Sequence, residues 1–164
     1  MKPVVHSLNC SIDFLVEQLG DVSDAELAAQ PAGIVNHPLW TVGHLTFVLQ
    51  MIGSVIGASQ LLPEGFHSLF GPGSAPVAEA GIYGTREEAI STLREIQAVV
   101  VDAVEKLDDA RLEEPFPDRA YLDVFPTVRH ALTQVLVGHT AFHVGPLSIW
   151  RKAVGLPPMN RSYE

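Results

Sequence analysis

The sequence predicts an all-α protein built as a four-helix bundle. In four long segments, apolar residues recur every three or four positions, which is the spacing of one face of an α-helix. No segment alternates polar and apolar residues as a half-buried strand does, and no internal repeat occurs. The 164 residues are enough for one apolar core, so we expect a single domain over residues 1–164.

The first predicted helix covers residues 5–19, and Gly20 is placed to end it. Its apolar face consists of Leu8, Ile12, Leu15 and Leu19. Ser23 and Glu26 then have the spacing of a capping box, in which each side chain bonds to the backbone N–H of the other residue. We therefore expect a short helical turn after the first helix.

The second predicted helix starts at Asn36-His37-Pro38, because proline is tolerated in a first helical turn, and it extends to about residue 58. Residues 59–84 are rich in glycine and proline, so we expect a long loop. Loops of this length within one domain are usually functional or disordered. Several of its residues are apolar, Phe66, Leu69 and Phe70 among them, and give it enough mass to pack down as a lid.

Thr85 and Glu88 form another capping box, which opens a third helix that extends to about residue 107. A second loop follows over residues 108–126, where three prolines interrupt any helical pattern. Thr127 can cap the last helix, which continues to about residue 154 and ends at Gly155.

The charge of the chain excludes several classes of protein. Nineteen acidic against ten basic residues give a formal net charge of −9, the wrong sign for binding nucleic-acid phosphates. The single Cys10 cannot form an intramolecular disulfide, so we expect a reducing cytoplasm, and the N-terminus lacks the features of a signal peptide.

Two windows contain no charged residue if histidine is counted as neutral: from Glu26 to Glu64 and from Arg129 to Arg151. They are long enough to raise the question of membrane spans. Both contain several histidine, glutamine or serine residues, and neither has a flanking basic cluster. Buried helices of a soluble protein fit better, and we expect no membrane partner.

Three histidines are candidates for a metal site. His139 and His143 are four residues apart on the last helix, so both imidazoles leave the same face. The intervening residues include no glutamate, which argues against a zinc protease of the H-E-x-x-H type. His44 lies in the middle of an uncharged helix, where an unpaired imidazole would be costly, and a shared metal ion would give it a partner.

The other histidines fit the site less well. His37 lies two turns before His44 on nearly the same face, about 10.5 Å along the axis and too far to share one ion. His130 points away from His139, and we expect it to be solvated. His6 with Cys10 could bind a metal, although a small buried cysteine is the simpler interpretation.

Three motifs together resemble the DinB/YfiT-like family of four-helix-bundle metalloenzymes. They are W-T-V-G-H-L at residues 40–45, G-H-T-A-F-H-V-G at residues 138–145 and R-K-x-x-G-L-P-P at residues 151–158. The resemblance implies an up-down-down-up bundle over nearly the whole chain. It also implies that one histidine of the second helix and the histidine pair of the fourth bind a divalent metal, which corresponds to His44, His139 and His143.

One position departs from this family. Many members have Gly-Gln shortly after the second histidine of the pair, whereas this chain has Gly145-Pro146. Pro146 lacks an amide donor and its ring clashes with the carbonyl of Phe142, so we expect a kink near His143. The departure affects polar contacts of the missing glutamine and leaves the three ligands in place.

The family includes thiol-dependent transferases and isomerases, so the resemblance implies a metal-dependent S-transferase that acts on a small electrophile. The cofactors are then one divalent metal, with Zn, Ni, Fe and Mn all suited to three histidines, and a low-molecular-weight thiol. Two alternatives remain: a metal-dependent hydrolase, for which the loop acids Asp118 and Asp123 could supply a base, and a non-catalytic metal- or ligand-binding bundle.

Two further predictions concern the surfaces of these helices. Trp40, Trp150 and the loop residue His67 could line a substrate pocket beside the metal. The face of the second helix opposite His44 is small and apolar and has nothing charged to present to water: Val42, Thr46, Leu49, Gly53 and Gly57. We therefore expect a homodimer that packs partly through this face.

Overall fold

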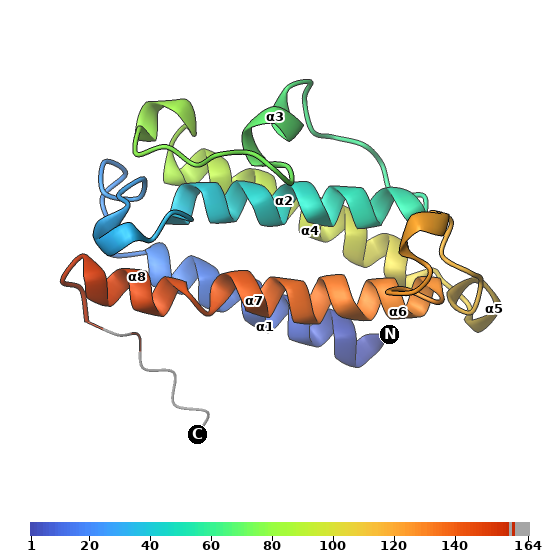
Figure 1. Ribbon diagram of the computed structural model, residues 1–164. Coiled ribbons are helices and arrows are strands. Elements are labelled where there is room, and N and C mark those ends of the chain that lie inside the picture. The colour runs from blue at the N-terminus through green and yellow to red at the C-terminus, as the bar shows by residue number, and fades with distance from the viewer. Residues whose placement is uncertain (158, 160–164) are drawn as a thin grey trace.

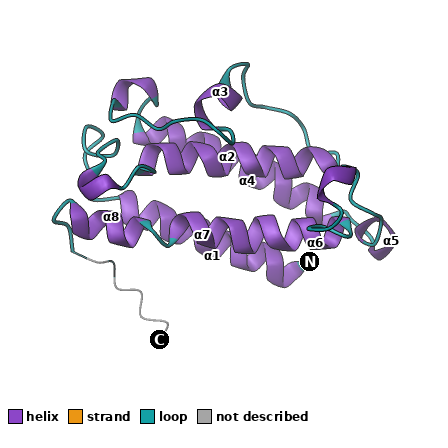
Figure 2. Ribbon diagram, viewed as in Figure 1, coloured by secondary structure: helices purple, strands orange, loops and turns teal. Residues whose placement is uncertain are grey.

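The computed structural model describes residues 1–157 and 159, and the fold is all-helical (Figures 1 and 2). Three of its long helices are α1 (Lys2–Leu19), α2 (Pro38–Val55) and α4 (Arg86–Glu105). A fourth helical stretch comprises α6 (Val128–Thr133), the π-helix η4 (Gln134–His139), α7 (Thr140–Val144) and α8 (Leu147–Ala153). Over the described residues there is no β-strand, only an isolated bridge between Pro115 and Thr127.

The two predicted loops contain short helical elements. The loop over residues 59–84 contains α3 (Phe66–Phe70) and the 3-10 turn η2 (Ala80–Ile82), and it crosses over α2 in Figure 1. The loop over residues 108–126 contains α5 (Asp109–Leu112) and η3 (Arg119–Tyr121), and another 3-10 turn, η1 (Pro31–Gly33), precedes α2. The apolar residues of the first loop do pack down, because α3 contacts α2 and Phe70 is buried.

α1 ends at Leu19, before Gly20 as predicted, and two arginines stabilise its C-terminus. Gly20 has φ −63°, which is right-handed. The last carbonyl groups of the helix accept instead from two side chains: Arg151 Nη1 donates to Gln18 at 2.6 Å, and Arg86 Nη1 donates to Leu19 at 2.9 Å. The final carbonyls of a helix have no partner within the helix, and the two guanidinium groups also interact favourably with the negative end of the helix dipole.

Pro146 interrupts the last helical stretch, as expected from its missing N–H. α7 ends at Val144 and α8 begins at Leu147. A buried glutamine of α1 bridges this break, since Gln18 Nε2 donates to the Val144 carbonyl at 3.4 Å and its Oε1 accepts from Ser148 at 3.0 Å. The side chain of Gln18 thus satisfies a carbonyl that a continuous helix would have paired itself.

The predicted dimer face of α2 is covered by α4 of the same chain, which corrects the interface. Val42 and Leu49 are 0% and 1% exposed in the single chain. A Cβ added to Gly53 would lie 2.8 Å from Val100 of α4, so glycine at this position permits close packing of the two helices. Gly57 follows the end of α2 and is exposed with φ +82°. The homodimer itself stays a prediction, and an interface cannot use the buried Val42, Leu49 or Gly53.

The uncharged windows have a structural explanation at α2. All residues from Pro38 to Thr46 are buried, because α4, the last helical stretch and the loop with α3 each contact this helix. No helix within residues 1–157 has the combination of length and apolar character that a membrane span requires.

Candidate metal centre

The N-terminus of α2 is fixed by His37, which is the N-cap and is fully buried. Its Nδ1 accepts a hydrogen bond from the backbone N–H of Trp40 at 3.2 Å. Burial lowers the pKa of His37 to about 4, so the ring is neutral at pH 7 and its Nδ1 is available as an acceptor. This agrees with the prediction that His37 lies too far along the helix to join His44, and it gives the residue a structural role.

His139 and His143 are positioned by the irregular last helical stretch. His139 is the final residue of η4, and His143 lies one turn later in α7. Segments of π-helix are rare and occur frequently at functional sites, since the wider turn changes which side chains face a neighbouring helix. The four-residue spacing of the two histidines is visible in the sequence, but no sequence pattern predicts η4.

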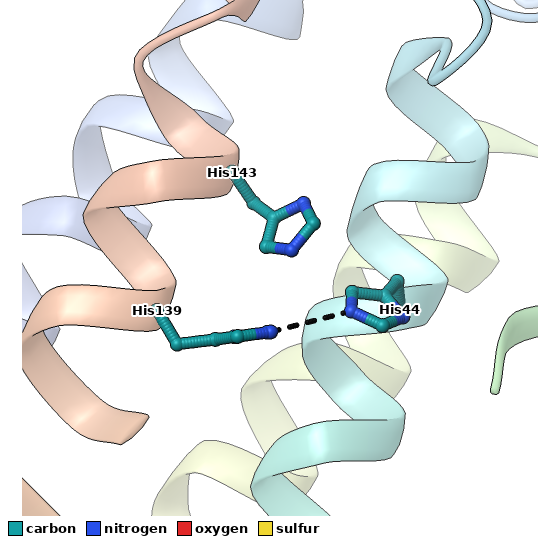
Figure 3. Close-up of side chains that lie close together, drawn as sticks. All are labelled: His44, His139 and His143. Carbon is teal, nitrogen blue, oxygen red and sulfur yellow. Dashed lines mark hydrogen bonds between the residues drawn. The ribbon is translucent and has the colours of Figure 1, made fainter. Parts of the chain in front are cut away.

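His44, His139 and His143 converge from two separate parts of the chain. One nitrogen from each of the three rings can be chosen so that all lie within 4.8 Å of one another. His44 Nε2 and His139 Nε2 are 3.4 Å apart, and the His143 ring centroid is 4.6 Å from that of His44. Figure 3 shows the His44 imidazole of α2 facing the two imidazoles of the last helical stretch, which project toward it from the opposite side.

The backbone of the 59–84 loop orients His44. His44 Nδ1 lies 2.7 Å from the carbonyl oxygen of Phe70, and because a carbonyl only accepts, Nδ1 carries the proton. In the neutral ring this leaves a lone pair on Nε2, the atom that faces His139. The apolar residues of this loop predict that it can pack down as a lid, but this contact is not predictable, because a backbone carbonyl has no signature in a sequence.

Gly43 makes that contact possible. A Cβ at this position would lie 2.1 Å from the ring of Phe70, so only glycine lets the phenyl ring pack directly on α2 beside His44. Trp40 adds a second anchor, since its indole N–H donates to Ser74 Oγ at 3.0 Å. The loop is therefore held against the site by one backbone and one side-chain hydrogen bond.

The histidines of the cluster are neutral at pH 7. Burial, with a smaller contribution from the charge of the neighbouring His44, lowers the pKa of His139 and of His143 to about 4. Burial also lowers the pKa of His44, against the opposing effect of the Phe70 carbonyl. Neutral imidazole is the form that binds a metal ion, so the three nitrogens do not have to lose protons first.

The donor set fits a divalent metal. Two nitrogens bound at 2.0–2.1 Å in a tetrahedral arrangement are about 3.3 Å apart, and the His44 and His139 nitrogens are 3.4 Å apart. His139 Nδ1 is buried and has no hydrogen-bond partner among residues 1–157 and 159. Without a metal, His139 can donate from Nε2 to the lone pair on His44 Nε2, and a metal ion bound between the two nitrogens would replace this hydrogen bond.

The three residues predicted to line a substrate pocket have different environments. Trp40 stacks on His44, with ring centroids 4.7 Å apart and planes at 11°, so it forms one wall of the cluster. Trp150 is fully buried in the core and its indole N–H donates to the Ala29 carbonyl at 2.8 Å. His67 is exposed on α3, and its ring lies 5.3 Å from Phe47.

The remaining histidines lie outside the cluster. His130 is exposed, as expected, and its Nδ1 is 2.9 Å from Thr127 Oγ1. His6 is exposed and its Nε2 lies 3.6 Å from the sulfur of Cys10. Within the described residues, the only group of three or more potential ligands is the one that contains His44, His139 and His143.

Comparison with known families agrees with this arrangement. The family model of the DinB superfamily matches residues 12–147, which is most of the chain and includes all three histidines. The chain belongs to the DinB superfamily. No curated protein and no solved structure matches it significantly. Membership in the DinB superfamily and the three-histidine cluster are both compatible with a metal-binding protein.

Proposed function

We propose that this DinB-superfamily protein is a divalent-metal-dependent S-transferase that joins a low-molecular-weight thiol to a small electrophile. The observation that carries the proposal is the convergence of three neutral histidine nitrogens, with no carboxylate in the group. Three neutral ligands leave the 2+ charge of a metal uncompensated and positions open, so an anionic ligand is favoured. A bound divalent metal would lower the pKa of a thiol and raise its thiolate fraction at neutral pH.

The chain's own residues supply binding and orientation. His44, His139 and His143 would hold the metal, and the Phe70 carbonyl fixes the ring and tautomer of His44. Trp40 covers His44 on one side, which limits the access of water there. His139 and His143 are only partly buried, so a thiol and an electrophile can approach from their side. The protein need not provide a nucleophile itself.

The alternatives differ in what they require from the chain. A hydrolase needs a general base beside the histidines, and Asp118 and Asp123 are both exposed on the second loop. A non-catalytic binding bundle needs only the three histidines. We favour the transferase because an activated thiol can attack without a protein base.

The test begins with metal binding by protein purified without a histidine tag. Equilibrium dialysis against Zn²⁺, Ni²⁺, Mn²⁺ and Fe²⁺ should give one ion per chain. His139→Ala should abolish binding, whereas His130→Ala, a histidine outside the cluster, should not change it. If no ion can be loaded at one per chain, both the transferase and the hydrolase are excluded.

Turnover separates the remaining possibilities. Loaded protein is incubated with an electrophile and cysteine, glutathione or coenzyme A, and the loss of free thiol is measured. Thiol-dependent consumption that His139→Ala removes supports the transferase. Hydrolysis without thiol would favour the second class, and metal binding without any turnover would favour the binding bundle.

Three broader inferences accompany this proposal. We infer an up-down-down-up four-helix bundle, supported by the course of the chain through α1, α2, α4 and the last helical stretch in Figure 1. The homodimer stays a prediction, and light scattering of the purified protein would test it. The reducing cytoplasm, inferred from the single Cys10, also stays a prediction.

A further inference from the structure

A hollow lies between α2 and the loop that follows α5. Its volume is about 300 Å³, and its walls are formed by the C-terminal half of α2, by residues 116–125 and by Val135 at the start of η4. This volume is at the small end of the range for ligand pockets, roughly 300–1,000 Å³. We call this hollow the apolar pocket.

The edge of the apolar pocket lies about one helical turn from the histidine cluster, and no histidine among residues 1–157 is part of its lining. Val48, in its α2 wall, follows His44 by four residues, and Val135, in its η4 wall, precedes His139 by four residues. In the α-helix α2, four residues return to nearly the same face about 6 Å along the axis, and in the π-helix η4 four residues are just under one of its wider turns. Since His44 and His139 meet at 3.4 Å, the two valines place the edge of the pocket about one turn from the histidines.

The lining of the pocket is suited to an uncharged ring. Three aromatic side chains cluster in its loop wall, with ring centroids 5.4 to 6.5 Å apart: Phe116, Tyr121 and Phe125. Tyr121 is 51% exposed, so one face of this cluster is free to contact a ligand. Such an arrangement is typical of sites that bind hydrocarbon and aromatic groups.

The charges near the pocket disfavour an anion. Asp118 is the charged residue in its lining, and its carboxylate is held at the wall by the N–H of Ala120 at 3.0 Å. Arg119 follows Asp118 in the loop but is exposed and does not line the pocket. Arg111 donates to the Val55 carbonyl at 2.7 Å and is paired with Glu114. An anionic ligand inside the pocket would therefore meet a carboxylate, and no lysine or arginine of the described chain is part of the lining.

We propose that the apolar pocket binds the uncharged, aromatic or hydrocarbon part of the electrophilic substrate and so places its reactive carbon beside the three histidines. That the ligand is a substrate rests on the proposed transferase function, but ligand binding by the pocket and its selectivity can be tested without turnover. It narrows the substrate class to neutral electrophiles with about one or two rings.

The test uses two fluorescent probes with the same ring skeleton. N-phenyl-1-naphthylamine is neutral, and 1-anilinonaphthalene-8-sulfonate adds one sulfonate. Titrated into metal-free protein, the neutral probe should bind saturably at one per chain and at least tenfold more tightly than the sulfonate. Equal affinity, or no saturable binding of the neutral probe, would overturn the proposal.

Matched variants locate the site. Val48→Phe places a ring in the pocket and should lower the affinity for the neutral probe at least tenfold. Val99→Phe, at a half-buried valine of α4 outside the lining, should change this affinity less than twofold. Asp118→Lys should raise the affinity of the sulfonate selectively. Equal loss in both phenylalanine variants, with circular dichroism showing both folded, would place the probe elsewhere and overturn the assignment.

The outcomes separate this inference from the proposed function. If the protein binds the neutral probe selectively but binds no metal, the proposed pocket is supported and the proposed transferase function is excluded. In an active transferase, Val48→Phe should raise the KM for an aromatic electrophile and leave the thiol dependence unchanged. An unchanged KM in that variant would show that the pocket is not the substrate site.

Discussion

Substituting Gly43 by alanine should weaken metal binding without removing a ligand. The added Cβ would lie 2.1 Å from Cε1 of Phe70, whereas ordinary contacts begin near 3.4 Å. The phenyl ring must therefore move by about 1.3 Å. Phe70 is buried and packs against Phe66 and Tyr83, so the ring cannot swing away freely, and its backbone should move as well.

The substitution should affect both stability and metal affinity. Overpacking lowers the free energy of unfolding by about 1–3 kcal/mol, and the better helix propensity of alanine restores about 0.5–1 kcal/mol. Loss of the 2.7 Å contact between the Phe70 carbonyl and His44 Nδ1 frees the ring and tautomer of His44. Loss of such a partner typically costs a metal site 10–100-fold in affinity. We expect a Kd for Zn²⁺ that is about 10–100 times higher.

Gly53→Ala is the matched control. It lies on the same helix, and its Cβ would lie 2.8 Å from Val100, so a comparable loss of stability is expected away from the histidines. Zn²⁺ affinity is measured by competition with a chelator, and stability by urea unfolding of the metal-free proteins. An unchanged Kd in Gly43→Ala, or an equal loss in both variants, would refute the role assigned to the Phe70 carbonyl.

Three other predictions concern stability. Burial lowers the pKa of His37, His139 and His143 to about 4, so the unfolded chain binds more protons than the folded chain once the pH falls below about 6.5. The urea midpoint of the metal-free protein should therefore fall as the pH drops from about 6.5 to 4. Below about pH 4 these histidines should cause no further decrease. A flat midpoint between about pH 6.5 and 4 would contradict their burial. Asp21→Asn should lower the free energy of unfolding by about 1–2 kcal/mol, because the buried Arg151 loses its carboxylate partner. The loss is limited because Asp21 is half exposed and solvent screens its charge. High salt should reduce the difference in stability between the two proteins. Gly53→Glu should unfold the chain and not merely dissociate a dimer, since a carboxylate would be forced against α4; a folded variant by circular dichroism would contradict this.

Much of the fold is predictable because its signals are local. The capping box of Thr85 and Glu88 opens α4 as expected, since both halves of the motif lie within four residues. The proline that starts α2 and the one that ends α7 act on their own backbone, so their positions translate directly into helix limits.

The missed features depend on partners far away in the sequence. Arg86 and Arg151 end α1 from elsewhere in the chain, and only the tertiary fold brings them to its last carbonyls. The apolar face of α2 was predicted to meet a second subunit because a helix wheel shows which faces are apolar but not which neighbour covers them. α4 covers that face, with Val100 against Gly53.

The three histidines could be selected from sequence because helical spacing is a local property and uncharged surroundings make a buried imidazole costly. What the sequence could not supply is the tautomer. The Phe70 carbonyl holds the proton of His44 on Nδ1, and the same choice exposes the Nε2 lone pair to His139. By linkage, a metal that binds Nε2 must strengthen the contact to Phe70 as much as that contact strengthens metal binding. The loop over residues 59–84 and the metal centre are therefore one thermodynamic unit, which explains why glycine at position 43 matters to chemistry on the opposite side of the His44 ring.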